Sequence, residues 1–320
     1  MRNGLTRLIR RLFQEQRGTV VVLVALSMVS LLGFTALVTD AGLLYLAKTE
    51  LANSVDAAAL AGGQNLLIDR ETAESTASEY AAQNGADAGE ITVTVSDDAR
   101  EITVTGRRTV NLFFARVLGH QTGEVRASAT ARVGPISSIS GAAPLSIGRQ
   151  EFVYGERYYL KDAPGGEGSG DPTHRSGWYG ALSLGGKGAC RYRENLKDGF
   201  SGVLRVGDVV DTETGNMSGP TGDGIGYRLE SCHHSPACTF ASFQRDCPRV
   251  LMVPVVEPYD WSGRQVKKVR VVGFAAFYVE EAPGSGNDNH VVGRFVRTIA
   301  SGAIDPGGSE FGLYGVKLVH

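Results

Sequence analysis

The feature that most constrains this chain is an uncharged run of 21 residues from Thr19 to Thr39, TVVVLVALSMVSLLGFTALVT. A helix of that length spans about 30 Å, which is the thickness of the hydrocarbon core of a bilayer. A cleaved signal peptide would have a shorter apolar stretch, with a small-residue cleavage site soon after it. The run therefore predicts an uncleaved transmembrane helix over 19–39, and a core helix of a soluble domain is the less favoured alternative.

The charges beside this run predict its orientation. Residues 1–18 form a basic tail that carries five arginines and a single acid, Glu15. Because basic flanks stay in the cytoplasm, we expect residues 1–18 inside and residues 40–320 outside. The whole chain has 32 Lys+Arg against 34 Asp+Glu, so it lacks the basic excess of a nucleic-acid-binding protein.

The helix is expected to continue beyond the membrane as a stalk. Residues 41–67 contain no proline and are rich in Ala and Leu, which favours helix. Apolar and small side chains recur on roughly one face, where they could contact a partner helix or the chain's own domain. The candidates for helix packing are Leu51, Val55, Ala58, Ala59 and Gly62.

A small α+β module is expected to complete residues 40–134. A second helix is predicted over 69–83, and the alternating segments Ile91–Val95 and Ile102–Val104 predict a β-hairpin. Residues 111–119 are expected to form a short helix, and residues 124–133 a further strand.

Glycine distinguishes the second half of the chain from the first. Residues 1–140 hold 12 of the 42 glycines and residues 141–320 hold the other 30. The uncharged residues 135–145 predict a linker. Short apolar runs between turns over 146–320 predict a mainly antiparallel β domain, either a sandwich or a barrel, with 266–279 as its best strand and Gly273 as a bulge. The expected fold class is therefore α+β.

The four cysteines all fall in this predicted β domain. An exported domain meets oxidising conditions, so two disulfides are favoured; three connectivities are open, and Cys238–Cys247 is the most local pair. Zinc is the alternative, because His233 and His234 follow Cys232. The gaps of five and eight residues are unusual for zinc, however, and adjacent histidines cannot easily serve one ion. The sequence predicts no metal and no cofactor, and the disulfide candidates are Cys190, Cys232, Cys238 and Cys247.

Other candidate sites carry less weight. Asp208, Asp211 and Glu213 could bind calcium, although a solvated turn is favoured. The aromatic pairs 158–159 and 178–179 could contact carbohydrate or protein, although a place in the core is favoured. The sequence contains neither G-x-S-x-G nor H-E-x-x-H, so no catalytic residue is predicted.

Residues 17–66 resemble the N-terminal segment of TadE/TadG-like proteins, the pilin-like proteins of tight-adherence (Flp) pilus assembly. The resemblance lies in Arg17-Gly18 before the apolar run, Asp40 directly after it, and the block LANSVDAAALA that begins at Leu51. The hairpin and the strand after it resemble that family's next module more loosely. Type IV prepilins typically carry Glu at the fifth position after the cleavage glycine, where this chain has Leu23. The resemblance therefore implies an anchored accessory protein rather than a cleaved filament subunit.

This resemblance implies a minor-pilin-like assembly component, single-pass in the bacterial cytoplasmic membrane and not an enzyme. It would act through helix packing and exterior protein contacts. The implied partners are pilin-like proteins, pilus assembly or secretion membrane proteins and the lipid bilayer, and a homo-oligomer is left open. Two alternatives remain: a membrane-tethered zinc-dependent hydrolase, and an adhesin-like module that binds envelope glycan or a surface.

Overall fold

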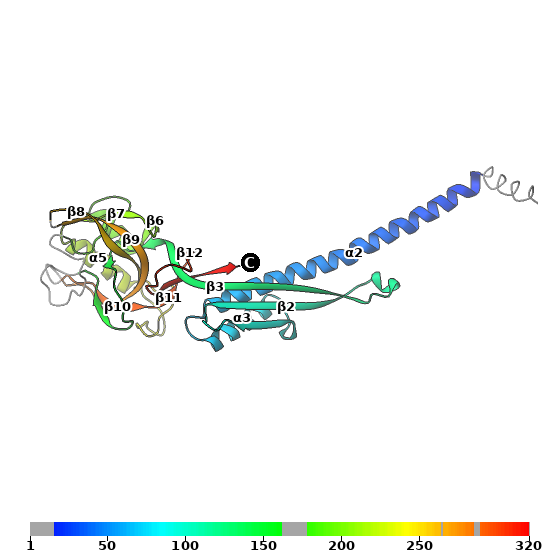
Figure 1. Ribbon diagram of the computed structural model, residues 1–320, viewed down its shortest axis with the longest axis horizontal. Helices are drawn as coiled ribbons and strands as arrows, with labels where there is room; N and C mark the ends of the chain where they lie inside the picture. Colours follow the sequence, from blue (N-terminus) through cyan, green and yellow to red (C-terminus); the bar gives the residue numbers. More distant parts are fainter. Residues whose placement is uncertain (1–15, 162–177, 264, 285–288, 320) are drawn as a thin grey trace, which may run out of the picture. The chain divides into compact units, whose positions relative to one another are not determined.

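The computed structural model describes residues 16–161, 178–263, 265–284 and 289–319 (Figure 1). The described chain is α+β, as predicted, and it divides into two compact units. The first unit comprises residues up to 58, 78–93 and 103–129, and the second comprises 59–77, 94–102 and 130 onward.

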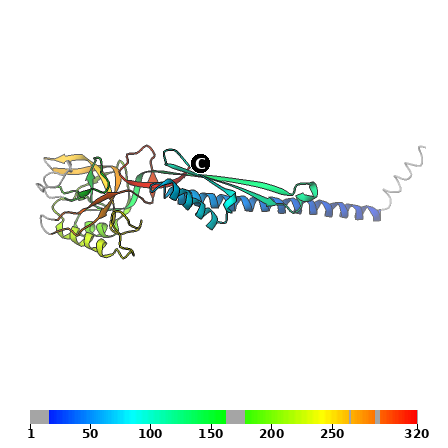
Figure 2. The ribbon, with the colours of Figure 1, turned by 90° about the horizontal axis from the view of Figure 1, so that it is seen from below.

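A single helix, α2 (Gln16–Gly63), dominates the first unit. It carries the predicted membrane span and the predicted stalk without a break, as expected for a stretch that contains no proline. In two views α2 runs beside β2 (Glu101–Asn111) and β3 (Thr122–Ala142) (Figures 1 and 2). The shorter elements before and between these strands are α3 (Arg70–Gln83), η1 (Ala88–Glu90), β1 (Ile91–Val95) and η2 (Ala115–Leu118).

Most of these elements agree with the sequence, and two differ. The helix over 69–83 and the hairpin strands are present, but residues 111–119 contain only the 3-10 turn η2. Strand β3 continues to Ala142, through most of the expected linker 135–145. Ile136 and Ile139 are buried there, and the strand pairs with two neighbours, so these uncharged residues form sheet rather than a connection.

The second unit is built around the antiparallel pair β8 (Val250–Ser262) and β9 (Gln265–Val279). Strand β9 is the predicted strand 266–279, and the register shift opposite Val255 and Val256 falls beside Gly273, as predicted. Alternate side chains of β9 enter two different cores. Phe274 and Tyr278 lie in one core and Phe277 in the other, so both faces of this strand are buried.

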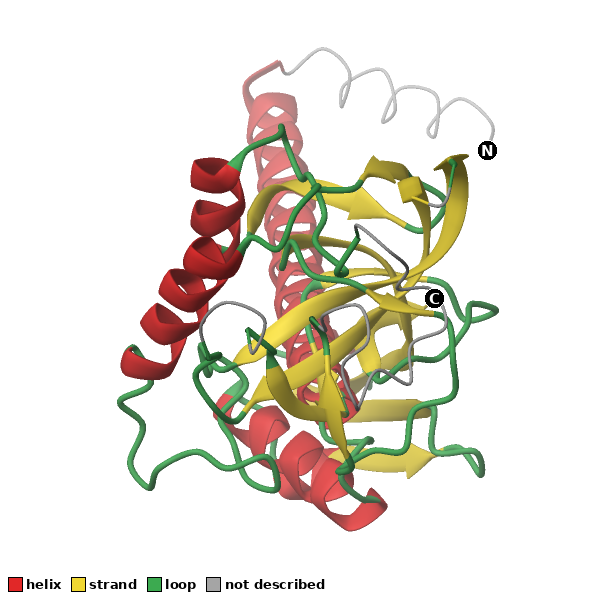
Figure 3. Ribbon diagram, turned by 90° about the vertical axis from the view of Figure 1, so that its left-hand side faces the viewer, coloured by secondary structure: helices red, strands yellow, loops and turns green. Residues whose placement is uncertain are grey.

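Shorter strands extend this pair into an open sheet (Figure 3). Strand β10 (Val292–Val296) joins β9 to β5 (Arg157–Tyr159), β7 (Val209–Asp211) pairs with β9, and β4 (Ile147–Gly148) runs parallel to β8. Strand β3 pairs with β6 (Phe200–Arg205), β12 (Gly302–Ile304) and β13 (Leu313–Val319), and β11 (Thr298–Ile299) pairs with β13. Among the described residues the sheet does not close, so the barrel alternative does not hold.

Two helices that the sequence analysis did not predict cover one of these cores. They are α4 (Ala189–Asp198) and α5 (Ser218–Glu230), which contribute Tyr192, Leu196 and Ile225. Glycines made α5 hard to recognise, but Gly224 has a packing reason. A Cβ at that position would lie 2.7 Å from Cδ2 of Leu196, so only glycine lets the two helices approach so closely.

Candidate functional site

The segment between α5 and β8 holds three of the four cysteines. This cysteine loop, residues 231–249, contains neither helix nor strand and is longer than most connections in compact domains. Cys232 lies just after α5, Cys247 lies shortly before β8, and Cys238 lies between them. Because Cys232 and Cys247 lie near the two ends of the loop, a contact between them brings these ends together.

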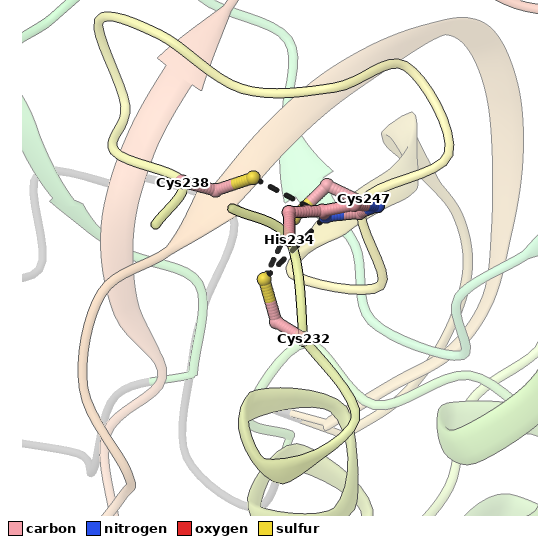
Figure 4. Close-up of side chains that lie close together, drawn as sticks. All are labelled: Cys232, His234, Cys238 and Cys247. Atoms are coloured by element: carbon pink, nitrogen blue, oxygen red, sulfur yellow. Dashed lines mark hydrogen bonds between the residues drawn. The ribbon is translucent and has the colours of Figure 1, made fainter. Parts of the chain in front are cut away.

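Three sulfur atoms and one imidazole nitrogen converge inside the cysteine loop (Figure 4). Nδ1 of His234 is 3.3 Å from Sγ of Cys238 and 3.7 Å from Sγ of Cys232, which in turn is 3.6 Å from Sγ of Cys247. All four atoms lie within 4.8 Å of one another. Cys238 and Cys247 are buried and the other two side chains are half-buried, so the cluster is sheltered from solvent.

A carboxylate orients His234 from the opposite side of its ring. Nε2 of His234 is 3.3 Å from Oδ1 of Asp246. A proton on Nε2 satisfies this contact and leaves the lone pair of Nδ1 directed at the sulfurs. The neighbouring His233 is exposed and takes no part in the cluster.

The surroundings make the thiols chemically unequal. Burial opposes ionisation of Cys232, but hydrogen bonds with His234 and the Cys247 thiol lower the pKa of Cys232 to about 7. Burial raises the pKa of Cys247 to about 12, and hydrogen bonds with Cys232 and Cys238 act in the same direction. Cys232 is therefore the first of the two to become a thiolate.

The structure brings together only some of the predicted cysteines. All four are free thiols, and Cys190 is exposed on α4, outside the cluster. The two disulfides therefore stay a prediction. Sequence reasoning named the other three cysteines and His234 as the zinc alternative but placed it below disulfides, because their spacing is irregular. Asp246 was missed, and its position next to Cys247 was the one available signal.

A second candidate site begins with the first half of α2. Its large apolar side chains from Val20 to Val38 are between 52% and 69% exposed. The hydroxyls of Ser27, Ser30 and Thr35 donate to carbonyl oxygens four residues earlier, at 2.8–2.9 Å. This part of the helix satisfies its polar atoms internally, as a bilayer requires, and it is long and apolar enough to span one.

Asp40, directly after this apolar segment, holds the connection between β2 and β3. Its carboxylate accepts hydrogen bonds from the backbone N–H groups of Phe113 at 2.9 Å, Phe114 at 3.0 Å and Ala115 at 2.6 Å. Burial opposes ionisation of Asp40, but these hydrogen bonds hold its pKa below the ordinary value of 3.8. The carboxylate thus caps η2 from a different element, as an N-cap residue does locally.

The connection held by Asp40 exposes large apolar side chains. In this tip loop, residues 112–121, Phe113 is 67% exposed, Phe114 47%, Val117 88% and Leu118 80%. Gly119 ends η2 in the left-handed conformation, and its backbone N–H donates to the carbonyl of Arg116. A turn bonded at both ends presents these four side chains outward.

Comparison with known families finds a match within α2 and the residues just after it. Residues 18–65 match a family model described as putative Flp pilus-assembly TadE/G-like. The N-terminal segment is therefore similar to TadE/G-like proteins. This match supports a component associated with the Flp, or tight-adherence, pilus. No curated protein and no solved structure matches the chain.

Within the TadE/G-like segment, the five residues predicted for helix packing are buried by the chain itself. Leu51, Val55, Ala58 and Ala59 have no exposed surface. A Cβ at Gly106 of β2 would lie 2.8 Å from Cδ1 of Leu51, and one at Gly62 would lie 2.6 Å from Cδ1 of Ile102. The sequence left open whether these residues contact a partner helix or the chain's own domain. In the structure they pack against the chain's own domain.

The remaining candidate residues, the carboxylates and the aromatic pairs, make contacts within the fold. Asp208 accepts a hydrogen bond from the backbone of Arg205, and Glu213 is buried and accepts one from Gly188, so the carboxylates do not form a joint site. Trp178 is 1% exposed and donates to the carbonyl of Ala181, which places it in the core as favoured.

Proposed function

We propose that this protein is a minor-pilin-like accessory component that helps assemble or anchor a tight-adherence pilus. It would sit in the bacterial cytoplasmic membrane with residues 1–18 inside and residues 40–320 outside. The observation that carries the proposal is the division of the TadE/G-like segment. Its first half leaves every large apolar side chain exposed, whereas in its second half Leu51, Val55 and Ala58 are buried within the first unit.

The exposed half supplies the surface for partners. Lipid and other membrane helices are the surroundings in which such a helix is stable, and helix association there depends on close packing. Gly33 has no atom within 4 Å of the position that its Cβ would take, so this face can receive another helix closely. Lateral contact with pilin-like proteins would therefore use residues 20–38 rather than the buried positions around Leu51.

We propose a structural rather than an enzymatic role. The hydrolase alternative needs a metal with an open coordination position, but the cysteine loop gathers four donor atoms, which is the number that fills a tetrahedral site. The adhesin alternative would use the second unit, and it remains compatible with anchoring by the same helix.

Photocrosslinking in the native bacterium tests the proposal. A photoreactive amino acid at Leu32, 68% exposed, should crosslink the chain to pilin-like or pilus assembly proteins. The matched control is the same amino acid at Leu46, 58% exposed but beyond the predicted span. The control should give weaker crosslinks or none to membrane partners.

Loss of function supplies the second measurement. Deletion of residues 20–38 should release the chain from membranes and reduce pilus assembly. Unchanged pili in the deletion strain, together with no crosslink from Leu32 to any pilus protein, would refute the proposal.

A further inference from the structure

We propose that Cys232, His234, Cys238 and Cys247 bind one zinc ion as a structural site. The first argument is geometric. With Zn–S of about 2.3 Å and Zn–N of about 2.0 Å, the edges of a tetrahedron are about 3.8 Å between sulfurs and about 3.5 Å from sulfur to nitrogen. The distances of 3.6 Å from Cys232 to Cys247, and of 3.3 and 3.7 Å from the cysteine sulfurs to His234, lie close to these edges.

The kind of donor selects the metal. Three thiolates and an imidazole are soft and borderline ligands, which suit zinc and not calcium or magnesium. Asp246 bonds to the far nitrogen of His234, the arrangement by which carboxylates fix the tautomer of a metal-binding histidine. Nδ1 is then the ligand atom, and it is the one that faces the sulfurs.

The number of cysteines argues against a disulfide at this place. Any disulfide within the cluster joins two sulfurs and leaves the third as a lone thiol, because Cys190 lies outside the cluster. A pair of Cys232 with Cys247 would leave the buried Cys238 beside His234, with no chemical role. One zinc ion uses all three sulfurs and the histidine.

The ion would connect elements on either side of the cysteine loop. Ligands near both ends fix the exit of α5 and the entry to β8, and Tyr278 of β9 donates to the carbonyl of Cys238 at 2.7 Å. Between the ligands, Arg245 donates to the side chain of Gln64 and, at 3.0 Å, to its carbonyl, just after α2 ends. Four protein ligands complete the coordination, so the site stabilises a fold and has no open position for substrate.

Metal analysis of the full chain, purified in detergent from membranes, tests the site. We expect about one zinc per chain in the wild type, retained after dialysis against a weak chelator. The variant Cys238→Ser should lose at least about nine-tenths of it, whereas Cys190→Ser should keep it. X-ray absorption of the wild type should show three sulfur neighbours and one nitrogen at the distances typical of zinc sites.

The wild-type measurements keep the proposal falsifiable if Cys238→Ser does not fold. Substitution of cobalt for zinc should give thiolate charge-transfer absorption in the wild type and in Cys190→Ser. Absence of metal in the wild type, or masses after alkylation without reduction that show Cys232 joined to Cys247, would overturn the site. Equal zinc content in Cys238→Ser and in the wild type would do the same.

A separate observation concerns the tip loop. We infer that Phe113, Phe114, Val117 and Leu118 insert into the exterior face of the same bilayer that α2 spans, an inference that rests on the proposed anchoring. Asp40 follows the uncharged run directly and binds the backbone of the tip loop, so it fixes the loop at the level where the run ends. Lipid is then the apolar phase that lies beside these exposed side chains.

The composition of the tip loop suits the membrane interface. Four apolar residues flank Arg116 in the sequence, and its guanidinium can reach lipid phosphates while the apolar groups enter the acyl boundary. Within the described part of the first unit, the other large apolar side chains exposed to this extent belong to α2. A soluble tip would have no reason to keep them outward.

Fluorescence quenching by brominated lipids tests the insertion. The full chain is reconstituted into vesicles of phosphatidylethanolamine and phosphatidylglycerol, and the variants are compared with the wild type, which contains Trp178 and Trp261. Phe114→Trp should add blue-shifted emission that brominated tails quench at least about twofold. The control Tyr80→Trp, at a 43% exposed position on α3, should add emission that is not quenched.

A third variant separates this inference from the proposed anchoring. Val29→Trp lies within the predicted span and should be quenched strongly. Quenching of Val29→Trp without quenching of Phe114→Trp would overturn insertion of the tip loop alone. Absence of quenching in both would overturn the anchoring on which it rests.

Discussion

The tip loop and the cysteine loop are both irregular connections, but they are fixed in opposite ways. In the tip loop a buried carboxylate binds the backbone, and the apolar side chains point outward. In the cysteine loop the side chains that carry chemistry point inward, and two of the cysteines are buried. This contrast shows that an irregular connection can be fixed through its backbone, which leaves its side chains free to face outward, or through side chains that converge inside it. The lipid contact that we propose concerns the first kind of loop, and the zinc ion that we propose concerns the second.

The largest effect is expected from removing a donor atom of the cysteine loop. Cys247→Ser should lower the free energy of unfolding by at least about 4 kcal/mol, because loss of a structural metal site is among the most destabilising changes. Cys190→Ser should change it by less than about 0.5 kcal/mol. Thermal unfolding of the detergent-purified chain measures both variants. Equal unfolding midpoints for Cys247→Ser and Cys190→Ser would mean that the side chains of the cysteine loop do not stabilise the fold.

The packing of α2 on β2 gives the next effect. Leu51→Ala deletes a side chain with no exposed surface that fills the space beside Gly106, so we expect a loss of about 2–5 kcal/mol. Leu46→Ala, at a 58% exposed position on the same helix, should cost less than about 0.5 kcal/mol. A large loss at Leu46 would mean that the stalk packs on a different face.

A buried lysine of the second unit predicts a pH dependence. Nζ of Lys161 donates to Oδ1 of Asn216 at 2.8 Å, and burial lowers the pKa of Lys161 from 10.5 to about 8. Between these values the unfolded chain keeps a proton that the folded chain has lost, so stability rises with pH, by about 3 kcal/mol in total. Denaturant unfolding at pH 8 and pH 10.5 should show this rise.

A matched pair of variants isolates the contribution of Lys161. Lys161→Met should remove the rise, and Lys187→Met, at an exposed position, should retain it. A rise that persists in Lys161→Met would assign the titration to other groups.

The smallest effect is expected at Asp40. Asp40→Asn leaves one acceptor oxygen where two served three N–H groups, so hydrogen exchange at Phe113, Phe114 and Ala115 should accelerate by about fivefold, the scale of a lost N-cap. Because the pKa of Asp40 is lowered, protection in the wild type should persist at neutral pH and fall only as pH drops through that lowered value. Unchanged exchange in Asp40→Asn would mean that the tip loop is held by its own turn.

Much of the fold follows from local patterns in the sequence. The apolar run, the proline-free stalk and the alternation in β1, β2 and β9 each report on neighbouring residues, and the structure places helix or strand at all of them. Helix α5 escaped prediction because its glycines oppose helix locally, and α4, which contains no glycine, is a short segment between Gly188 and Gly199. The low helix propensity of glycine is offset by the close packing of Gly224 on Leu196, which exists only once the two helices are in contact.

The candidate sites depended on distant residues and were harder to predict. Three cysteines and the two adjacent histidines were visible as a group in the sequence, apart from Cys190, but nothing in their spacing indicated that His234 joins the cluster and His233 does not. The hydrogen bonds of Asp40 join residues more than 70 positions apart. Its place after the apolar run was recognised from the family resemblance, whereas its role became visible only in the structure.

Strand β3 has a consequence for mechanical load. It runs from the first unit into the second, where residues 130–135 form six consecutive antiparallel pairs with β13. Hydrogen bonds of such a ladder lie perpendicular to the strands. Tension applied along β3 would therefore shear all six pairs together instead of opening them one by one.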